Sequence, residues 1–136
     1  MTEKISVTLN VTEASQIDFL VEKGLFNSRS DFLRLAARKE LEAHGNTFYQ
    51  FLEEEEKYVK TSSTHNSVTL GIMRVSKKEL QELINHGRKM KYRVIGMIIF
   101  DDKITASEIH EAVAGLHLVG KLVASDEVKA ALGGLM

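Results

Sequence analysis

The chain opens with a strict alternation of apolar and polar side chains. Residues 4–9 read KISVTL, so that three apolar residues alternate with three polar ones. Alternation with a period of two, rich in β-branched residues, predicts a strand with one buried and one polar face. The apolar face carries Ile5, Val7 and Leu9, and the polar face carries Lys4, Ser6 and Thr8.

Two helices are predicted to follow this strand. Thr12 is the expected N-cap of the first helix, and Gly24 supplies its C-terminal stop. The second helix is expected to begin at Ser28, which with Asp31 has the spacing of a capping-box variant, and to end at Gly45. The apolar stripes of the two helices are Ile17, Leu20 and Val21, and Phe32, Leu35, Ala36 and Leu41.

Residues 46–67 are predicted to form a helical connector followed by a hinge. The aromatic first half is expected to be helical, and Thr61–Ser67, rich in Ser, Thr, His and Asn, is the best candidate for the hinge. The run Glu53–Glu56 is interpreted as a solvated helix face, with an acidic binding patch as the alternative.

Residues 68–136 contain an internal repeat. Three segments share an apolar run, a glycine, a second apolar run, a polar turn and a helix-like stretch, and their glycines are Gly71, Gly96 and Gly120. A period in the twenties is typical of strand-plus-helix solenoids, so we predict a small leucine-rich-repeat-like β/α stack. The recurring glycine fits a column in which no Cβ can be accommodated. An ordinary α+β domain is the alternative.

Acidic pairs follow two of these repeats at matching positions. Asp101-Asp102 and Asp126-Glu127 are interpreted as acids at helix N-termini rather than as catalytic carboxylates.

Composition narrows the class of protein. The chain has 136 residues, of which 43% are hydrophobic and 27% charged, as in globular domains. It has no apolar run that could span a bilayer, no signal-like N-terminus and no cysteine, so we expect a cytoplasmic protein without disulfides. The net charge of −1 means that any DNA binding must come from a local arrangement.

The first 45 residues are too few to fold alone. One strand and two helices bury too little apolar surface, and a lone strand leaves both edges unpaired. We therefore predict an intertwined dimer in which two copies of residues 4–9 pair antiparallel over a shared core. The polar faces then form a two-stranded ribbon, which fits the major groove of DNA. The free N–H groups of Arg29 and Ser30 would hold a phosphate on each flank.

These residues carry a resemblance to a known family. Residues 4–44 resemble the ribbon-helix-helix domain of CopG-type and nickel-responsive repressors in the alternating strand, the Gly24-Leu25-Phe26 turn and the Ser-Arg-Ser-acidic start of the second helix. The resemblance implies an obligate dimer with base-reading and phosphate-binding residues. The base readers would be Lys4, Ser6 and Thr8, and the phosphate contacts Ser28, Arg29 and Ser30.

The sequence departs from the family pattern in two respects. Arginine is common where Lys4 stands, and lysine cannot make the same bidentate fork. The first 45 residues are also nearly neutral, with six basic and seven acidic residues, so affinity is expected to be modest or strongly dependent on salt and assembly.

No metal site or cofactor is expected. The histidines form neither an i, i+4 pair nor an H-x-H pair, so the metal-sensing part of the resemblance does not carry over. They are His44, His65, His86, His110 and His117. Basic residues between Arg74 and Arg93 are interpreted as a solvated rim, with a second contact to DNA phosphates as the alternative.

The sequence thus predicts an α+β regulator of transcription, a repressor, and not an enzyme, since it has no phosphate-binding loop, nucleophile elbow or paired histidine–carboxylate motif. Residues 1–45 would form the DNA-binding and dimerisation domain. The expected partners are double-stranded DNA and a second copy, without a membrane, in the nucleoid. The alternative is an antitoxin-like binding protein, or a scaffold in which the ribbon-helix-helix unit serves mainly dimerisation.

The C-terminal repeats are expected to serve assembly, or the sensing of a protein partner or effector through residues 68–136. Because the chain ends in AALGGLM without a polar cap, the open end of the stack would join dimers into tetramers or larger assemblies. The alternative is that Leu135 and Met136 fold back and cap the last repeat.

Overall fold

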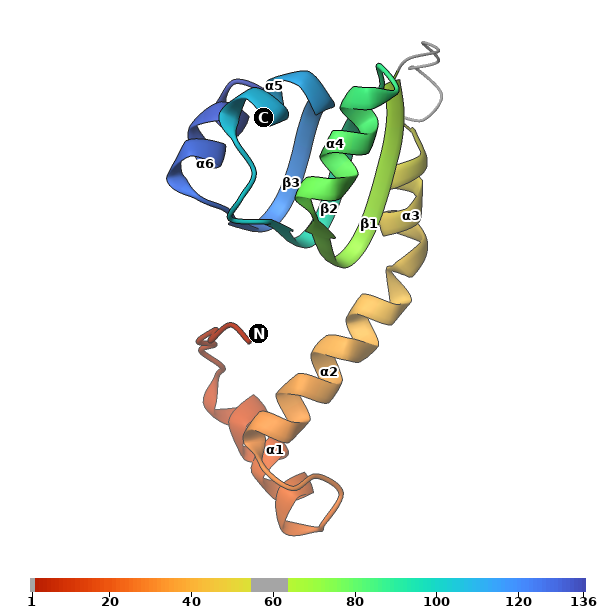
Figure 1. Ribbon diagram of the computed structural model, residues 1–136. Coiled ribbons are helices and arrows are strands. Elements are labelled where there is room, and N and C mark those ends of the chain that lie inside the picture. Colours follow the sequence, from red (N-terminus) through yellow and green to blue (C-terminus); the bar gives the residue numbers. More distant parts are fainter. Residues whose placement is uncertain (1, 55–63) are drawn as a thin grey trace. The chain divides into compact units, whose positions relative to one another are not determined.

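The computed structural model describes residues 2–54 and 64–136. The chain divides into two compact units, Met1–Tyr49 and Gln50–Met136. Within the described residues it is a mixed α/β protein with six helices and one three-stranded parallel sheet (Figure 1).

The first unit is built on helices α1 (Val11–Glu22) and α2 (Arg29–Ala43). Helix α1 is capped by Asn10, whose side chain accepts a 2.7 Å hydrogen bond from the Glu13 backbone, so the predicted N-cap Thr12 is wrong by two residues. Asn and Thr are both good capping residues, so the sequence offers two candidates. The backbone of Asn10 is extended, and the helix begins directly after it at Val11.

The end of α1 follows the prediction. Gly24 has a φ of +78°, and its N–H bonds to the Val21 carbonyl while the Leu25 N–H bonds to the Leu20 carbonyl. This pair of hydrogen bonds is a Schellman motif, which needs a left-handed residue where Gly24 stands.

Helix α2 begins after Ser28, as predicted, but Gly45 does not stop the helical path. Helix α2 ends at Ala43 with His44 as its C-cap, and Gly45 is the first residue of α3 (Gly45–Glu54). The aromatic half of the connector is therefore helical, which confirms that prediction.

The hinge prediction is wrong where it can be checked. Residues 61–63 lie outside the described residues, whereas Thr64–Ser67 form the start of strand β1 (Thr64–Val75) and pair with residues 89–92. The polar side chains of this segment are compatible with a strand as well as with a loop, and pairing with β2 decides between the two.

The second unit consists of three consecutive strand–helix pairs. Strand β1 is followed by α4 (Lys77–Asn85), β2 (Lys89–Phe100), α5 (Ala106–Ala112), β3 (Val113–Val123) and α6 (Asp126–Gly133). The sheet is parallel, with strand order β1-β2-β3. Buried side chains from all three helices join one face of this sheet in a single core, which includes Leu80, Val94, Ile98, Ile109 and Val128.

The repeat glycines form a column across the sheet. Gly71 pairs with Gly96, and Gly96 with Gly120, with φ between +128° and +138°. A Cβ on Gly96 would lie 2.1 Å from the Gly71 carbonyl oxygen, and one on Gly120 would lie 1.8 Å from that of Gly96. The predicted glycine column is confirmed, and a Cβ has no room at Gly96 and Gly120, whereas the space at Gly71 is open.

Each helix of this unit starts at a hydroxyl cap that follows a strand. The side chains of Ser76, Thr105 and Ser125 accept hydrogen bonds from the third residue of α4, α5 and α6. At α5 the box is reciprocal, because the Glu108 carboxylate also accepts from the Thr105 backbone at 3.2 Å.

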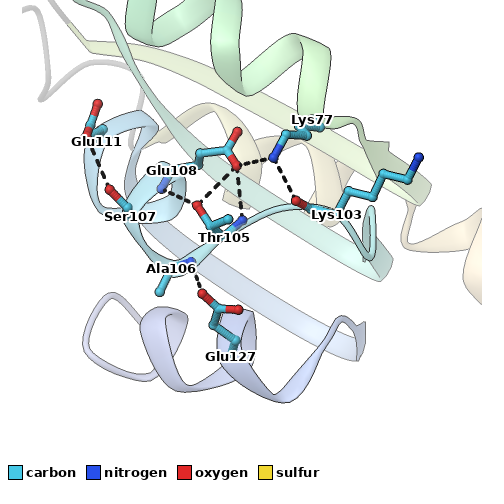
Figure 2. A network of polar contacts seen from close by, with 8 residues as sticks. All are labelled: Lys77, Lys103, Thr105, Ala106, Ser107, Glu108, Glu111 and Glu127. Atoms are coloured by element: carbon cyan, nitrogen blue, oxygen red, sulfur yellow. Dashed lines mark hydrogen bonds and ion pairs between the residues drawn. The ribbon is translucent and has the colours of Figure 1, made fainter.

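Side chains on the helix starts also tie one repeat to the next (Figure 2). Lys77 of α4 donates to Glu108 of α5 at 2.7 Å and to the Lys103 carbonyl at 2.9 Å. Glu127 of α6 accepts from the Ala106 backbone of α5 at 2.9 Å. The hydrogen bond from Lys77 lowers the pKa of Glu108.

The interpretation of the acidic pairs holds at one position and fails at the other. Asp126 and Glu127 lie in the first turn of α6, as predicted. Asp101 and Asp102 do not lie in α5, whose first-turn acid is Glu108, because residues 101–105 form a loop before the helix begins.

The expected open C-terminal end is wrong at Leu135. The backbone of Leu116 in β3 donates to the Leu135 carbonyl at 3.2 Å, and Leu135 packs on the core. Met136 remains 64% exposed. The alternative in which the tail folds back therefore holds for Leu135.

Replacing Gly96 by alanine should destabilise the second unit more than the same change at Gly71. Both positions have positive φ, which costs a non-glycine residue on the order of 1–3 kcal/mol. Only at Gly96 does the added Cβ also meet a carbonyl oxygen, whereas at Gly71 nothing lies within 4 Å. Urea unfolding followed by circular dichroism measures both variants, and equal losses would contradict the close approach.

Replacing Lys77 by methionine should cost about 1–2 kcal/mol at neutral pH, because it leaves the Glu108 carboxylate, 13% exposed, without its charged donor. Since the pKa of Glu108 is lowered in the folded state, this contribution is full above the ordinary carboxyl range and is lost as the pH falls through the lowered value. The stability gap to the wild type should therefore shrink in acid. Lys78→Met, at the exposed neighbour, is the control and should show neither effect.

Candidate nucleic-acid interface

The predicted base-reading residues lie on an exposed N-terminal segment. In the single chain, residues 2–10 are neither helix nor strand, and Lys4, Ser6 and Thr8 are exposed. The apolar residues between them are also open, with Ile5 78% and Val7 59% exposed. A strand exists only with a hydrogen-bonded neighbour, so the strand stays a prediction that needs a second chain.

The first unit has almost no core of its own. Among its described residues only Ile17 is buried, and none is buried in the whole of α2. An apolar groove runs along α1 and the start of α2, lined by residues that include Leu9, Ile17, Leu20 and Phe32. Leu35 and Leu41, two residues of the predicted inner stripe of α2, are 42% and 57% exposed. The unit therefore leaves open the surface that the sequence predicts to be buried.

The start of α2 is held by local contacts. The Ser28 hydroxyl accepts from the Asp31 backbone at 3.1 Å, and the Asp31 carboxylate accepts from the Asn27 backbone at 3.1 Å. The Phe26 ring packs edge-on against Phe32, with centroids 4.9 Å apart, and fixes the turn from α1. The Ser28 half of the predicted capping-box variant is thus present, but the Asp31 carboxylate accepts from Asn27 instead of from the N-cap backbone.

The phosphate-binding candidates lie together at this helix start. Ser28, Arg29 and Ser30 are all exposed. The N–H groups of Arg29 and Ser30 belong to the first helical turn, whose donors have no intrahelical acceptor. The positive end of the helix dipole adds to their attraction for an anion.

Arg29 has an intrachain partner that sequence reasoning missed. Its Nε and Nη2 donate to the two carboxylate oxygens of Asp18 at 2.7 and 2.6 Å, and these hydrogen bonds raise the pKa of Arg29 and lower that of Asp18. Asp18 lies in α1, across the turn, so no local spacing rule connects the two residues. A guanidinium has five N–H donors, and the pair leaves three of them for another acceptor.

The basic residues between Arg74 and Arg93 do not form one solvated rim. Lys77 is tied to α5, and Lys89 donates to the His110 carbonyl at 3.3 Å. Arg93, in β2, is only 2% exposed. That interpretation is therefore wrong for Arg93, which is buried in the sheet, and it is weakened for the half-buried Lys77, whereas Lys89 stays exposed.

The described residues contain neither a metal-binding cluster nor a membrane-spanning helix. Over residues 2–54 and 64–136, no group of three or more His, Asp or Glu side chains is arranged to hold a metal ion. No helix in the same residues is both long and apolar enough to cross a bilayer.

The comparisons with known proteins identify the family. A model described as the ribbon-helix-helix transcriptional regulator family matches residues 1–129, and the chain belongs to this family. The match covers the second unit almost completely as well as the first. No curated protein and no solved structure matches the chain.

Proposed function

We propose that this protein is a sequence-specific DNA-binding repressor that reads the major groove with an antiparallel ribbon made by two copies of residues 4–9. The observation that carries the proposal is the exposed alternation of Lys4, Ser6 and Thr8 in a chain of the ribbon-helix-helix transcriptional regulator family. A lysine can donate to guanine, and hydroxyls can donate or accept at several base edges.

Dimerisation is part of the same proposal. The groove along α1 and the exposed side chains of Ile5 and Val7 together support a partner that covers them. Two copies would add strand to strand and close both grooves over one core. Folding and association of the first unit would then form one equilibrium.

The second contact would be made to the DNA backbone. Ser28 and the N–H groups of Arg29 and Ser30 would bind a phosphate at the start of α2 in each copy. The free donors of the Arg29 guanidinium add to this contact while Asp18 holds its other edge. Such contacts fix the register of the protein on DNA and carry no sequence information.

Residues 68–136 are assigned to assembly or to the sensing of a partner or effector, after the connector 46–67. We interpret their three strand–helix pairs as a short solenoid. Exposed apolar side chains at Leu70, Ile72 and Val119 alternate with the residues that face the helices, and they support contact with another copy and thus a tetramer. No enzymatic activity is proposed, and the site of action would be the nucleoid.

Replacing Lys4, Ser6 and Thr8 together by alanine should abolish sequence preference and leave the dimer intact. Each lost base contact should cost on the order of 1–3 kcal/mol, about tenfold in affinity per 1.4 kcal/mol. Genome-wide recovery of DNA bound to the wild-type protein defines the operator. Fluorescence anisotropy then compares the operator with an unrelated duplex at fixed salt.

The matched control removes the same kind of side chains from the second unit. The double variant Lys129→Ala and Ser107→Ala changes exposed residues of α6 and α5 and should keep the operator preference. An unchanged preference in the folded triple variant would refute the base-reading assignment.

A further inference from the structure

A cleft in the second unit lies between α4 and the neighbouring strands β1 and β2. Its volume is about 360 Å³, which lies within the range of sites for small organic molecules. Side chains from all three elements line the cleft. The apolar and aromatic ones are Met73, Leu83, Met90 and Tyr92, and the charged and polar ones are Glu79, Glu82, His86 and Arg88.

The feature that points to a ligand is Tyr92. It is only 2% exposed, its ring packs edge-on against Phe100 with centroids 6.2 Å apart, and it lines the cleft. Within the described residues the hydroxyl of Tyr92 has no hydrogen-bond partner, and it is not among the side-chain atoms that are fully enclosed without one. The hydroxyl therefore faces the cleft, where it can donate to or accept from a molecule that enters.

The protonation of Tyr92 is fixed by its surroundings. Burial raises the pKa of Tyr92, and the carboxylate of Glu79 raises it further. The phenol is therefore neutral over the physiological range, with one donor and acceptor lone pairs. Glu79 lines the same cleft as Tyr92, so a negative charge lies near the ring.

The charges at the rim are available as well. Within the described residues, Glu79, Glu82 and Arg88 form no ion pair. Glu79 and Glu82 are three residues apart in α4, so their side chains share one helix face. The two carboxylates and the phenol oxygen together offer three acceptor groups to a cation that carries several N–H donors.

We propose that this cleft binds a small organic molecule with an ammonium group on an apolar body. The ammonium donates to the Glu79 carboxylate and to the Tyr92 hydroxyl oxygen, and Glu82 adds to the negative potential. The apolar body lies against Met73, Leu83 and Met90; methionine side chains are flexible and adapt to ligand shape. If the ligand also has a carboxylate, Arg88 forms a second contact with it. The site is independent of the DNA-binding proposal.

The test uses the full chain and isothermal titration calorimetry with three probes. Phenethylamine has the ammonium and the apolar body, phenylalanine adds a carboxylate, and phenylacetate has the body with a negative charge only. We expect saturable binding of phenethylamine, phenylalanine or both at one site per chain, and none of phenylacetate. Tighter binding of phenylalanine would assign Arg88 to the carboxylate, and tighter binding of phenethylamine would leave Arg88 outside the contact.

Two variants and a control locate the binding. Tyr92→Phe removes only the hydroxyl, and Glu79→Gln removes a charge at the exposed rim; each should weaken amine binding about tenfold. Asp102→Asn removes the same charge from an exposed turn outside the cleft and should change nothing. Thermal unfolding checks that each variant is folded. Absence of amine binding at millimolar concentration, equal binding of phenylacetate, or amine binding unchanged in Glu79→Gln would overturn the proposal.

Discussion

A single β-strand cannot satisfy its own backbone hydrogen bonds, and this constraint governs the N-terminal part of the protein. Residues 4–9 have the alternation of a strand, yet no other strand is available to them in the first unit. The same unit buries only Ile17 among its described residues. The dimer that we propose would remove both deficits, because a second copy would supply a strand and cover the apolar groove. The polar side chains of the strand would then be presented twice, in the spacing of a ribbon that fits DNA.

The second unit solves the same problem within one chain. Its three strands pair in parallel, so neighbouring strands hydrogen-bond to each other. The glycine column fixes their register, because a Cβ at Gly96 or Gly120 would meet a carbonyl oxygen. Hydroxyl caps start each helix directly after its strand, and the contacts from Lys77 and Glu127 fasten neighbouring helices. A self-sufficient second unit can therefore carry the cleft proposed to bind a ligand, whereas the first unit would need the proposed partner.

Features set by neighbours in sequence could be predicted from the sequence. Gly24 as a helix stop, Ser28 as a cap and the glycine column all follow from local patterns or from the repeat. Local patterns fail where two choices are equally good, as with Asn10 and Thr12, or where a partner strand decides, as at Thr64–Ser67.

Contacts between distant elements had no signal in the sequence. The pair between Arg29 and Asp18 crosses a turn, and the cleft around Tyr92 exists only once α4 packs beside β1 and β2. For the proposed base-reading residues the situation is reversed. Their pattern is plain in the sequence, and the single chain leaves them exposed without the strand partner that would order them.

The central claim is that residues 4–9 of two chains form one antiparallel ribbon. It is tested most directly by nuclear magnetic resonance on a dimer mixed from isotope-labelled and unlabelled chains, with filters that detect only contacts between chains. The account predicts interchain contacts among the side chains of Ile5, Val7 and Leu9, with slow amide exchange in this segment. Interchain contacts confined to the second unit, with fast exchange throughout residues 4–9, would contradict it.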